Sequence, residues 1–288
     1  MRARLALLFL VLLVAGCSRI DSLRLAHANS GTPVAWPAGE ASLAVDIRLT
    51  EDGRPWMPVS VDGSPAVPFL LQASAGAVAI TGARAAGFGP VGAGRLTLQA
   101  HLLPGIPGGL LVKQRRLELG TLALGDQSVL LVAPADWPHG QPRGGPAGVL
   151  GYDLFRRFVV ELDVDGRRLV LHRPGGPDLG GMAEVQRLAV LARVPYFEAW
   201  LDRGPAQGRW LRLQFEPAAP LGVCLDRVRR GNVVVAGRSV AVAEATCPPE
   251  VRDYRESGRD GVFGAAALRG LVVAVDYEGG RIGFRPRD

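Results

Sequence analysis

The chain has 288 residues, of which 48% are hydrophobic and 21% are charged, and its formal net charge at pH 7 is +6. A chain of this length can bury a large core and can form one large domain or two smaller ones. Its arginines are scattered and form no basic run, which argues against a nucleic-acid partner.

The first residues have the layout of a secretory leader. Two arginines precede an uninterrupted apolar run from Leu5 to Ala15, which is too short to span a bilayer because spanning takes about 20 residues. The segment VAGC that ends at Cys17 resembles a bacterial lipobox, so we expect residues 1–16 to be a signal peptide and Cys17 to carry lipid. Because Ser18 follows, we expect an outer-membrane lipoprotein of a Gram-negative bacterium that faces the periplasm. An ordinary signal peptide with a chance cysteine is the alternative.

The next segment, residues 17–41, is polar and contains Gly and Pro, which predicts a tether. From Ser42 onward, short runs rich in Val and Leu alternate between apolar and polar residues and are bounded by Gly, Pro or Asp. This period of two predicts β-strands. Pairs of residues that tolerate positive φ join neighbouring runs, as tight hairpins require. These pairs are Asp52-Gly53, Asp62-Gly63, Asp165-Gly166 and Gly279-Gly280.

A segment in the middle of the chain is repeated near its end. Residues 148–171 and 261–284 align without a gap and share nine identical positions. In each copy an apolar pair ends in a glycine, Gly151 or Gly264, where we expect a close backbone approach, and a strand then leads into a hairpin. The repeat predicts two homologous lobes. Their predicted ranges are 42–172 and 185–288, with a linker at 173–184.

The repeated segments resemble the pepsin and retropepsin superfamily of aspartic proteases. VLG at 149–151, followed by YDLFRRFVVELD, resembles the closing segment of bacterial retropepsin-like proteins. VFGAAALRGLVVAVDYEGGRIGF, which ends at Phe284, resembles the closing segment of pepsin-like ones. The resemblance covers roughly residues 42–288. It implies an all-β, bilobal pepsin-like fold with a cleft between the lobes.

The resemblance also implies where a catalytic acid pair would lie, since one apolar strand of each family lobe ends in Asp-Thr/Ser-Gly. Here the first such strand ends in Gln72, Ala73 and Ser74, and the second place is taken by Gln214, Phe215 and Glu216. On this alignment Gln72 and Gln214 replace the two acids, and their amides could hydrogen-bond across the lobes. The residues expected at the cleft are Gln72, Ala73, Ser74, Gln214, Phe215, Glu216, Gly151 and Gly264.

This replacement argues against proteolysis. An aspartic protease needs two adjacent carboxylates that share a proton, and a neutral amide has no proton to exchange. Loss of one general acid or base lowers a rate by about 10²–10⁴-fold, and here both are missing. We therefore expect a non-catalytic cleft that binds an extended peptide or envelope-protein segment as an added strand. The alternatives are a peptidase with non-standard acids, for which Glu216 is the candidate, and a structural envelope component.

No cofactor and no metal are expected. The four histidines are at positions 27, 101, 139 and 172, without metal-ligand spacing. Export to an oxidising compartment predicts a disulfide between Cys224 and Cys247, with two buried thiols as the alternative. Residues 100–117 fall where the family carries a mobile flap, and a plain surface loop is the alternative.

Overall fold

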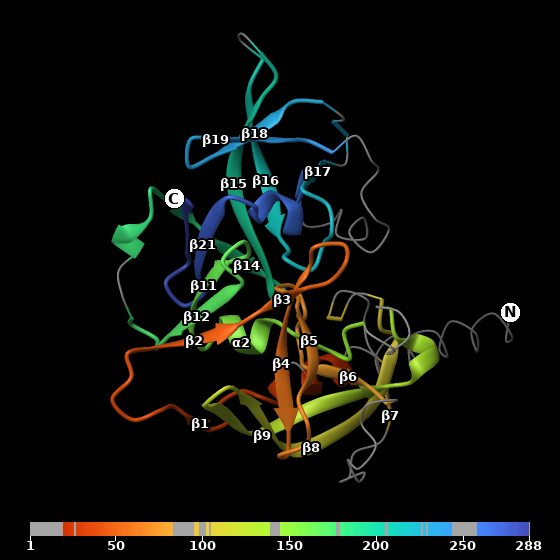
Figure 1. Ribbon diagram of the computed structural model, residues 1–288. Helices are drawn as coiled ribbons and strands as arrows, with labels where there is room; N and C mark the ends of the chain where they lie inside the picture. Colours follow the sequence, from red (N-terminus) through yellow and green to blue (C-terminus); the bar gives the residue numbers. More distant parts are fainter. Residues whose placement is uncertain are drawn as a thin grey trace, which may run out of the picture.

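A computed structural model of the chain (Figure 1) is mostly β, as the period of two predicts. Its strands form three sheets. The structure describes residues 20–25, 27–82, 95–97, 102–103, 105–138, 145–176, 179–204, 207–225, 227–228, 230–243 and 258–287. Within these ranges, no helix combines the length and the apolar character needed to cross a membrane.

The first sheet forms the N-terminal lobe, at the bottom of Figure 1. Its nine strands run in the order β1-β9-β6-β10-β5-β4-β8-β7, and β3 pairs with β4. They are β1 (Val34–Ala35), β3 (Arg48–Leu49), β4 (Pro55–Val61), β5 (Val67–Leu71), β6 (Ala79–Thr81), β7 (Arg95–Thr97), β8 (Gly108–Leu119), β9 (Leu122–Val132) and β10 (Gly148–Leu150). A short helix, η1 (Pro134–Asp136), follows β9.

The second sheet forms the C-terminal lobe, at the top of Figure 1. Its order is β17-β20-β16-β15-β18-β19, and β14 pairs with β15. The strands are β14 (Ala189–Leu191), β15 (Val194–Asp202), β16 (Arg209–Phe215), β17 (Val223–Leu225), β18 (Asn232–Val235), β19 (Arg238–Ala241) and β20 (Gly261–Phe263).

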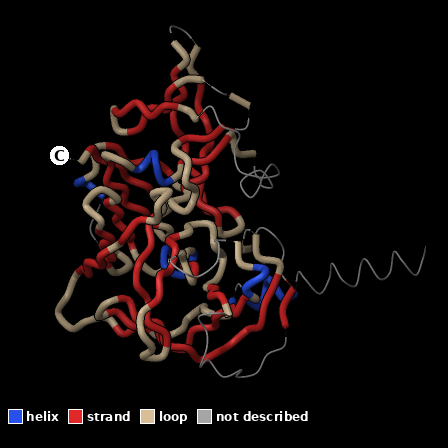
Figure 2. The backbone as a smooth tube through the Cα atoms, turned by 45° about the vertical axis from the view of Figure 1, so that its right-hand side comes forward, coloured by secondary structure: helices blue, strands red, loops and turns tan. Residues whose placement is uncertain are grey.

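The third sheet lies between the lobes and takes strands from both (Figures 1 and 2). It contains β2 (Ser42–Asp46), β11 (Val159–Asp163), β12 (Arg168–His172), β13 (Glu184–Arg187), β21 (Leu271–Asp276) and β22 (Arg281–Pro286), with η2 (Leu179–Gly181) before β13. β11 and β21 come from the two copies of the repeat and pair antiparallel, with Val160 opposite Val275. The repeated segments therefore meet and join the lobes.

The two copies also have the same local topology. β10 runs parallel to β5 and antiparallel to β6, and β20 lies in the same way between β16 and β17. Short helices follow, α2 (Tyr152–Phe155) and η4 (Ala265–Leu268). A Cβ atom on Gly151 would lie 1.9 Å from the carbonyl oxygen of Gln72, and one on Gly264 would lie 2.3 Å from that of Leu221. The close backbone approach predicted at both glycines is confirmed.

The N-terminal segment corrects one prediction, because residues 20–25 and 27–36 are folded and do not form a tether. Residues 20–25 are helical, and β1 pairs with β9. Asn29 is fully buried, and its side-chain nitrogen donates to the carboxylate of Asp153 (2.8 Å) and to the carbonyl of Ser128 (3.1 Å). Trp36 packs on Phe158 with ring centroids 5.4 Å apart. These contacts dock the segment onto the N-terminal lobe.

Candidate functional site

The backbone hydrogen bonds identify which residues are equivalent at the two strand ends. The amide of Gln72 donates to the carbonyl of Leu150 at 3.0 Å, and the amide of Glu216 donates to the carbonyl of Phe263 at 3.0 Å. Leu150 and Phe263 are the last residues of β10 and β20, which are equivalent strands. Glu216 is thus the counterpart of Gln72, and the alignment that gave this place to Gln214 is wrong by two residues.

The error has a physical cause. Side chains two apart in an extended strand point to the same side, so Gln214 and Glu216 satisfy the same alternating pattern. The hydrogen-bond register with β20, where Gln214 lies opposite Val262 and Phe215 opposite Phe263, separates them. Sequence alone does not contain that register.

The carboxylate of Glu216 connects the two lobes. Its Oε1 atom accepts hydrogen bonds from the backbone amides of Ala73 (3.1 Å) and Ala218 (3.2 Å). Its Oε2 atom accepts from the backbone amide of Ser74 (3.1 Å) and from the Ser74 hydroxyl. Three of these four donors belong to the N-terminal lobe. A carboxylate offers about four acceptor sites, so these donors occupy the group fully.

Glu216 is only 4% exposed. Burial raises the pKa of its carboxyl group above the ordinary 4.5, because the low-polarity surroundings disfavour the charged form. The hydrogen bonds from Ser74, Ala218 and Ala73 act in the opposite direction and are outweighed. The group therefore holds its proton to higher pH than an exposed glutamate.

The side chain of Gln214 lies next to the carboxylate of Glu216. It is 2% exposed, and its side-chain oxygen accepts a hydrogen bond from Arg259 at 2.7 Å, while its nitrogen is 3.5 Å from the Glu216 carboxylate. Gln72 and Gln214 are both described, and no hydrogen bond joins them. The expected bond between two amides is therefore wrong, and the carboxylate of Glu216 instead bonds to Ala73 and Ser74 of the opposite lobe.

Aromatic packing supports the same junction. The Tyr277 hydroxyl donates to the carbonyl of Ala73 at 3.2 Å. The ring of Phe155 stacks on Tyr277 at 5.4 Å and meets Phe215 edge-on at 6.4 Å. Because Phe215 has no exposed surface, it is a core residue. Tyr277 and Arg259 take part in the junction although the sequence gave no signal for either.

Comparison with known proteins establishes the fold. No protein-family model matches the chain, and a search of curated protein sequences finds no match. Among solved structures the chain is similar to an aspartic proteinase from Irpex lacteus, with a TM-score of 0.56 and 9% sequence identity over 86% of this chain and 98% of that one. The protein has a pepsin-like fold. Basic 7S globulin from soybean is also similar, with a TM-score of 0.49 and 12% identity over 88% of this chain and 95% of that one.

Within this pepsin-like fold, the described strand ends lack an acid pair. Catalysis by the usual route needs one carboxylate to take a proton from water while the other donates one. Here one strand end carries the amide of Gln72, and the other carries Glu216, whose acceptor sites are filled by protein donors. The arrangement can hold the lobes together, but it offers no free base to water.

Part of the segment predicted to be a flap lies against the loop that follows the first strand end. The backbone amide of Gly76 donates to the carbonyl of Leu102 at 2.7 Å. Leu102, Leu103 and Ile106, which belong to the segment predicted to be a flap, are at most 3% exposed. Leu102 is therefore packed against the loop that follows Gln72, which is itself 7% exposed.

Glu216 is hydrogen-bonded to Ala73 and Ser74 across the junction of the two lobes. The predicted cleft residues are all buried. They are Gln72, Ala73, Ser74, Gln214, Phe215, Glu216, Gly151 and Gly264. Among the described residues, no group of His, Cys, Asp and Glu side chains could hold a metal ion. Cys224 is buried in β17, whereas Cys17 and Cys247 lie outside the described residues, so lipidation and the disulfide stay predictions.

Proposed function

We propose that the protein is a non-catalytic, pepsin-fold protein of the cell envelope that binds an extended peptide or protein segment between its lobes. The observation that carries this proposal is the state of the two strand ends. The side-chain amide of Gln72 does not titrate at ordinary pH and so cannot serve as a general acid or base. The four acceptor sites of Glu216 are filled by protein donors. We propose that a chain held between such lobes is bound without being cut, because the groups for cutting it are missing.

Binding of an extended segment would use main-chain hydrogen bonds to strand edges, as in other modes of β-strand addition. Because Leu102 packs against Gly76, in the loop that follows Gln72, we propose that a ligand that reaches the first strand end displaces this cover. The measured affinity is then lowered by the fraction of molecules that are open. Loosening the cover should strengthen binding.

The test uses residues 18–288, which lack the predicted signal peptide and the predicted lipidated cysteine, and unfolded casein as the probe. We expect no cleavage between pH 3 and pH 8, with commercial pepsin as the positive control. We also expect casein peptides to slow amide hydrogen exchange in segments 72–76 and 102–106. Cleavage that a pepstatin-like inhibitor stops would replace the proposal by an active peptidase.

The closed floor favours a structural envelope component as a second candidate. Leu102→Ala separates the two functions, because truncating this side chain loosens the cover. Leu96→Ala is the matched control, since Leu96 is buried in the same apolar cluster as Leu102 but lies in β7. A binding protein should bind the peptides several-fold more tightly with Leu102→Ala and not with Leu96→Ala. A structural component should bind them in neither variant.

A further inference from the structure

The short helix at residues 20–25 has two different sides. Ser22 and Leu25 face the protein, with 6% and 1% of their surface exposed. Ile20 and Leu23 face outward, with 52% and 59% exposed. They are three apart in the sequence and therefore neighbours on one helix face. Among the described residues, no other large aliphatic side chain is as exposed as either of them.

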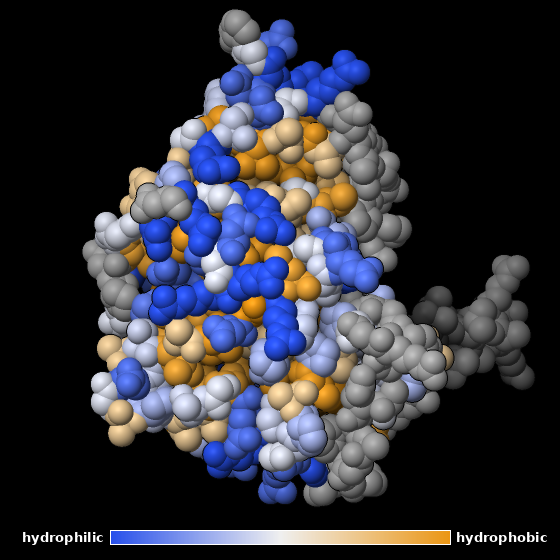
Figure 3. All heavy atoms as spheres, viewed as in Figure 1, coloured by the Kyte–Doolittle hydropathy of each residue, from blue (hydrophilic) through white to orange (hydrophobic). Residues whose placement is uncertain are grey.

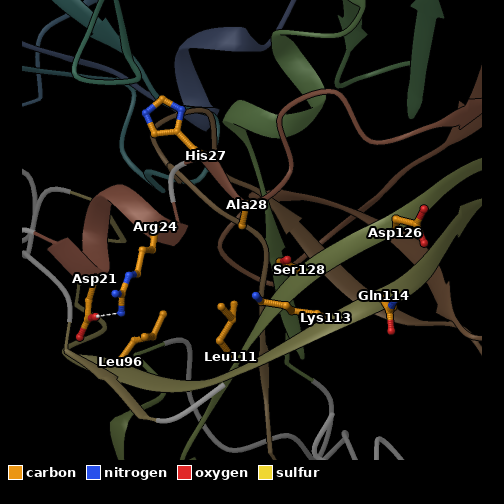
Figure 4. A pocket seen from close by; sticks show the side chains of 10 residues that line it. All are labelled: Asp21, Arg24, His27, Ala28, Leu96, Leu111, Lys113, Gln114, Asp126 and Ser128. Atoms are coloured by element: carbon orange, nitrogen blue, oxygen red, sulfur yellow. Dashed lines mark ion pairs between the residues drawn. The ribbon is translucent and has the colours of Figure 1, made fainter. Parts of the chain in front are cut away.

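The inner side of this segment faces the N-terminal lobe. Asp21, Arg24 and His27 line a cavity of about 600 Å³ against β8 and β9, and Asp21 and Arg24 form an ion pair at 3.8 Å (Figure 4). Ile20 and Leu23 do not line it. Their outward positions are therefore not explained by packing within the lobe.

The segment that follows this helix fixes the helix to the lobe. Besides the bonds of its side chain, Asn29 accepts hydrogen bonds at its carbonyl from the guanidinium groups of Arg156 and Arg157. The backbone amide of Ser128 donates to the Asn29 side-chain oxygen at 2.6 Å. The helix is thus held by a buried polar network and has little freedom to swing away from the lobe.

The chain between the predicted lipid and the helix is short. Cys17 and Ile20 are three residues apart, which spans at most about 11 Å even when fully extended. The polar layer on each side of a bilayer is about 5–7 Å thick, from a total of 40–45 Å around a core of about 30 Å. A lipid on Cys17 would therefore place Ile20 at or near the membrane surface.

We infer that the helix face formed by Ile20 and Leu23 is a membrane seat, whose occupant is the outer part of a phospholipid bilayer. The inference rests on the proposed cell-envelope location and on the predicted lipidation of Cys17. Ile20 and Leu23 insert at the acyl–headgroup boundary, as the apolar face of an interfacial helix does. The lobes are then held rigidly at the membrane rather than on a flexible tether.

The test separates the seat from the native lipid. The chain starting at Ser18 is oxidised with periodate at its N-terminal serine and coupled to a single fourteen-carbon chain. One such chain gives only reversible binding, with a partition constant of about 10⁴ M⁻¹, so further contributions are measurable. Binding is measured by co-sedimentation with vesicles of phosphatidylethanolamine and phosphatidylglycerol.

The variant Ile20→Ser/Leu23→Ser should bind at least about tenfold more weakly than the wild type. The control Val185→Ser/Leu191→Ser removes aliphatic side chains that are 44% and 45% exposed in the C-terminal half, and it should bind like the wild type. An alanine pair at 20 and 23, which preserves helix propensity, should fall between the wild type and the serine pair. Equal binding of both serine pairs would overturn the seat.

The localisation has its own readout, which is the mass of the protein recovered from Gram-negative membranes. An unmodified Cys17 would contradict the lipoprotein proposal. The vesicle experiment would still report on the helix face.

Discussion

Replacing Glu216 by glutamine tests whether this carboxylate holds the two lobes together. Glutamine preserves the shape but turns one acceptor oxygen into an NH₂ group. The best orientation puts this NH₂ at the Oε2 position, where it can donate to the Ser74 hydroxyl. The backbone amide of Ser74, which donates to Oε2 at 3.1 Å, then loses its acceptor in a buried site.

The expected loss of stability follows from these contacts. One buried amide without an acceptor costs about 1–3 kcal/mol. The bonds from Ala73 and Ala218 also weaken, because they no longer end on a charge. Removal of a buried charge offsets part of this loss, since burial disfavours the ionised form of Glu216. We expect a net loss of about 2 kcal/mol, which lowers Tm by about 4–8 °C for a chain of this size.

Thermal unfolding of residues 18–288 at pH 7.5, followed by circular dichroism, measures the effect. Glu198→Gln is the matched control, because Glu198 is exposed on β15 and the same change there should alter stability by less than about 0.5 kcal/mol. If the Tm of Glu216→Gln equals that of Glu198→Gln, the carboxylate does not hold the lobes together, and the reasoning from its hydrogen bonds is refuted.

Three further predictions concern the same framework. Burial raises the folded-state pKa of Glu216, so the stability linked to its proton is fully present below the unfolded value near 4.5 and is lost as pH rises through the folded value. The unfolding free energy of the wild type relative to Glu216→Gln should therefore increase as pH falls from 8 to 5; a flat or decreasing difference in urea titrations would contradict this. Asn29→Ala should lower stability by about 2–4 kcal/mol and speed tryptic cleavage of the N-terminal segment, and an unchanged cleavage rate would show that the segment is held by other contacts. Gly151→Ala should prevent folding or lower stability by more than about 4 kcal/mol, because its Cβ would lie 1.9 Å from the Gln72 carbonyl oxygen, whereas Gly181→Ala, with nothing within 4 Å, should fold normally in the same expression and melting assays.

Much of the architecture could be predicted from local sequence because the repeat carries its own geometry. An apolar pair, a glycine, a short helical turn and a strand recur in both halves. Gly151 and Gly264 occupy equivalent places because each lies where another backbone approaches too closely for a side chain. Such a steric requirement determines the identity of a single residue, so the sequence alone can indicate it.

The candidate site was less predictable because it depends on register and on contacts between distant segments. Gln214 and Glu216, which directly follows β16, have side chains on the same side, and only pairing with β20 shows which one is the counterpart of Gln72. The partners of Glu216 are the amides of Ala73 and Ser74, and a backbone amide leaves no mark in the sequence.

The N-terminal segment failed as a prediction for a related reason. Its Gly, Pro and polar residues have the composition of a tether, but composition does not show which other parts of the chain a segment contacts. In the sequence Asn29 looks like a loop residue, because its hydrogen-bond partners Ser128 and Asp153 come from distant segments that only the fold brings beside it. A polar residue that satisfies its hydrogen bonds within the protein can be fully buried, and here it fixes the segment in place.

The absence of an acid pair at the two described strand ends also affects how the lobes are joined. Two carboxylates facing each other would repel unless they shared a proton. With Gln72 at one strand end, the other carboxylate can approach the opposite lobe, and Glu216 uses this freedom to accept three hydrogen bonds from it. An amide rather than a carboxylate at position 72 therefore permits the three hydrogen bonds that close the junction. Restoring an acid at position 72 would not by itself restore chemistry, because the acceptor sites of Glu216 would still be filled by Ala73, Ser74 and Ala218.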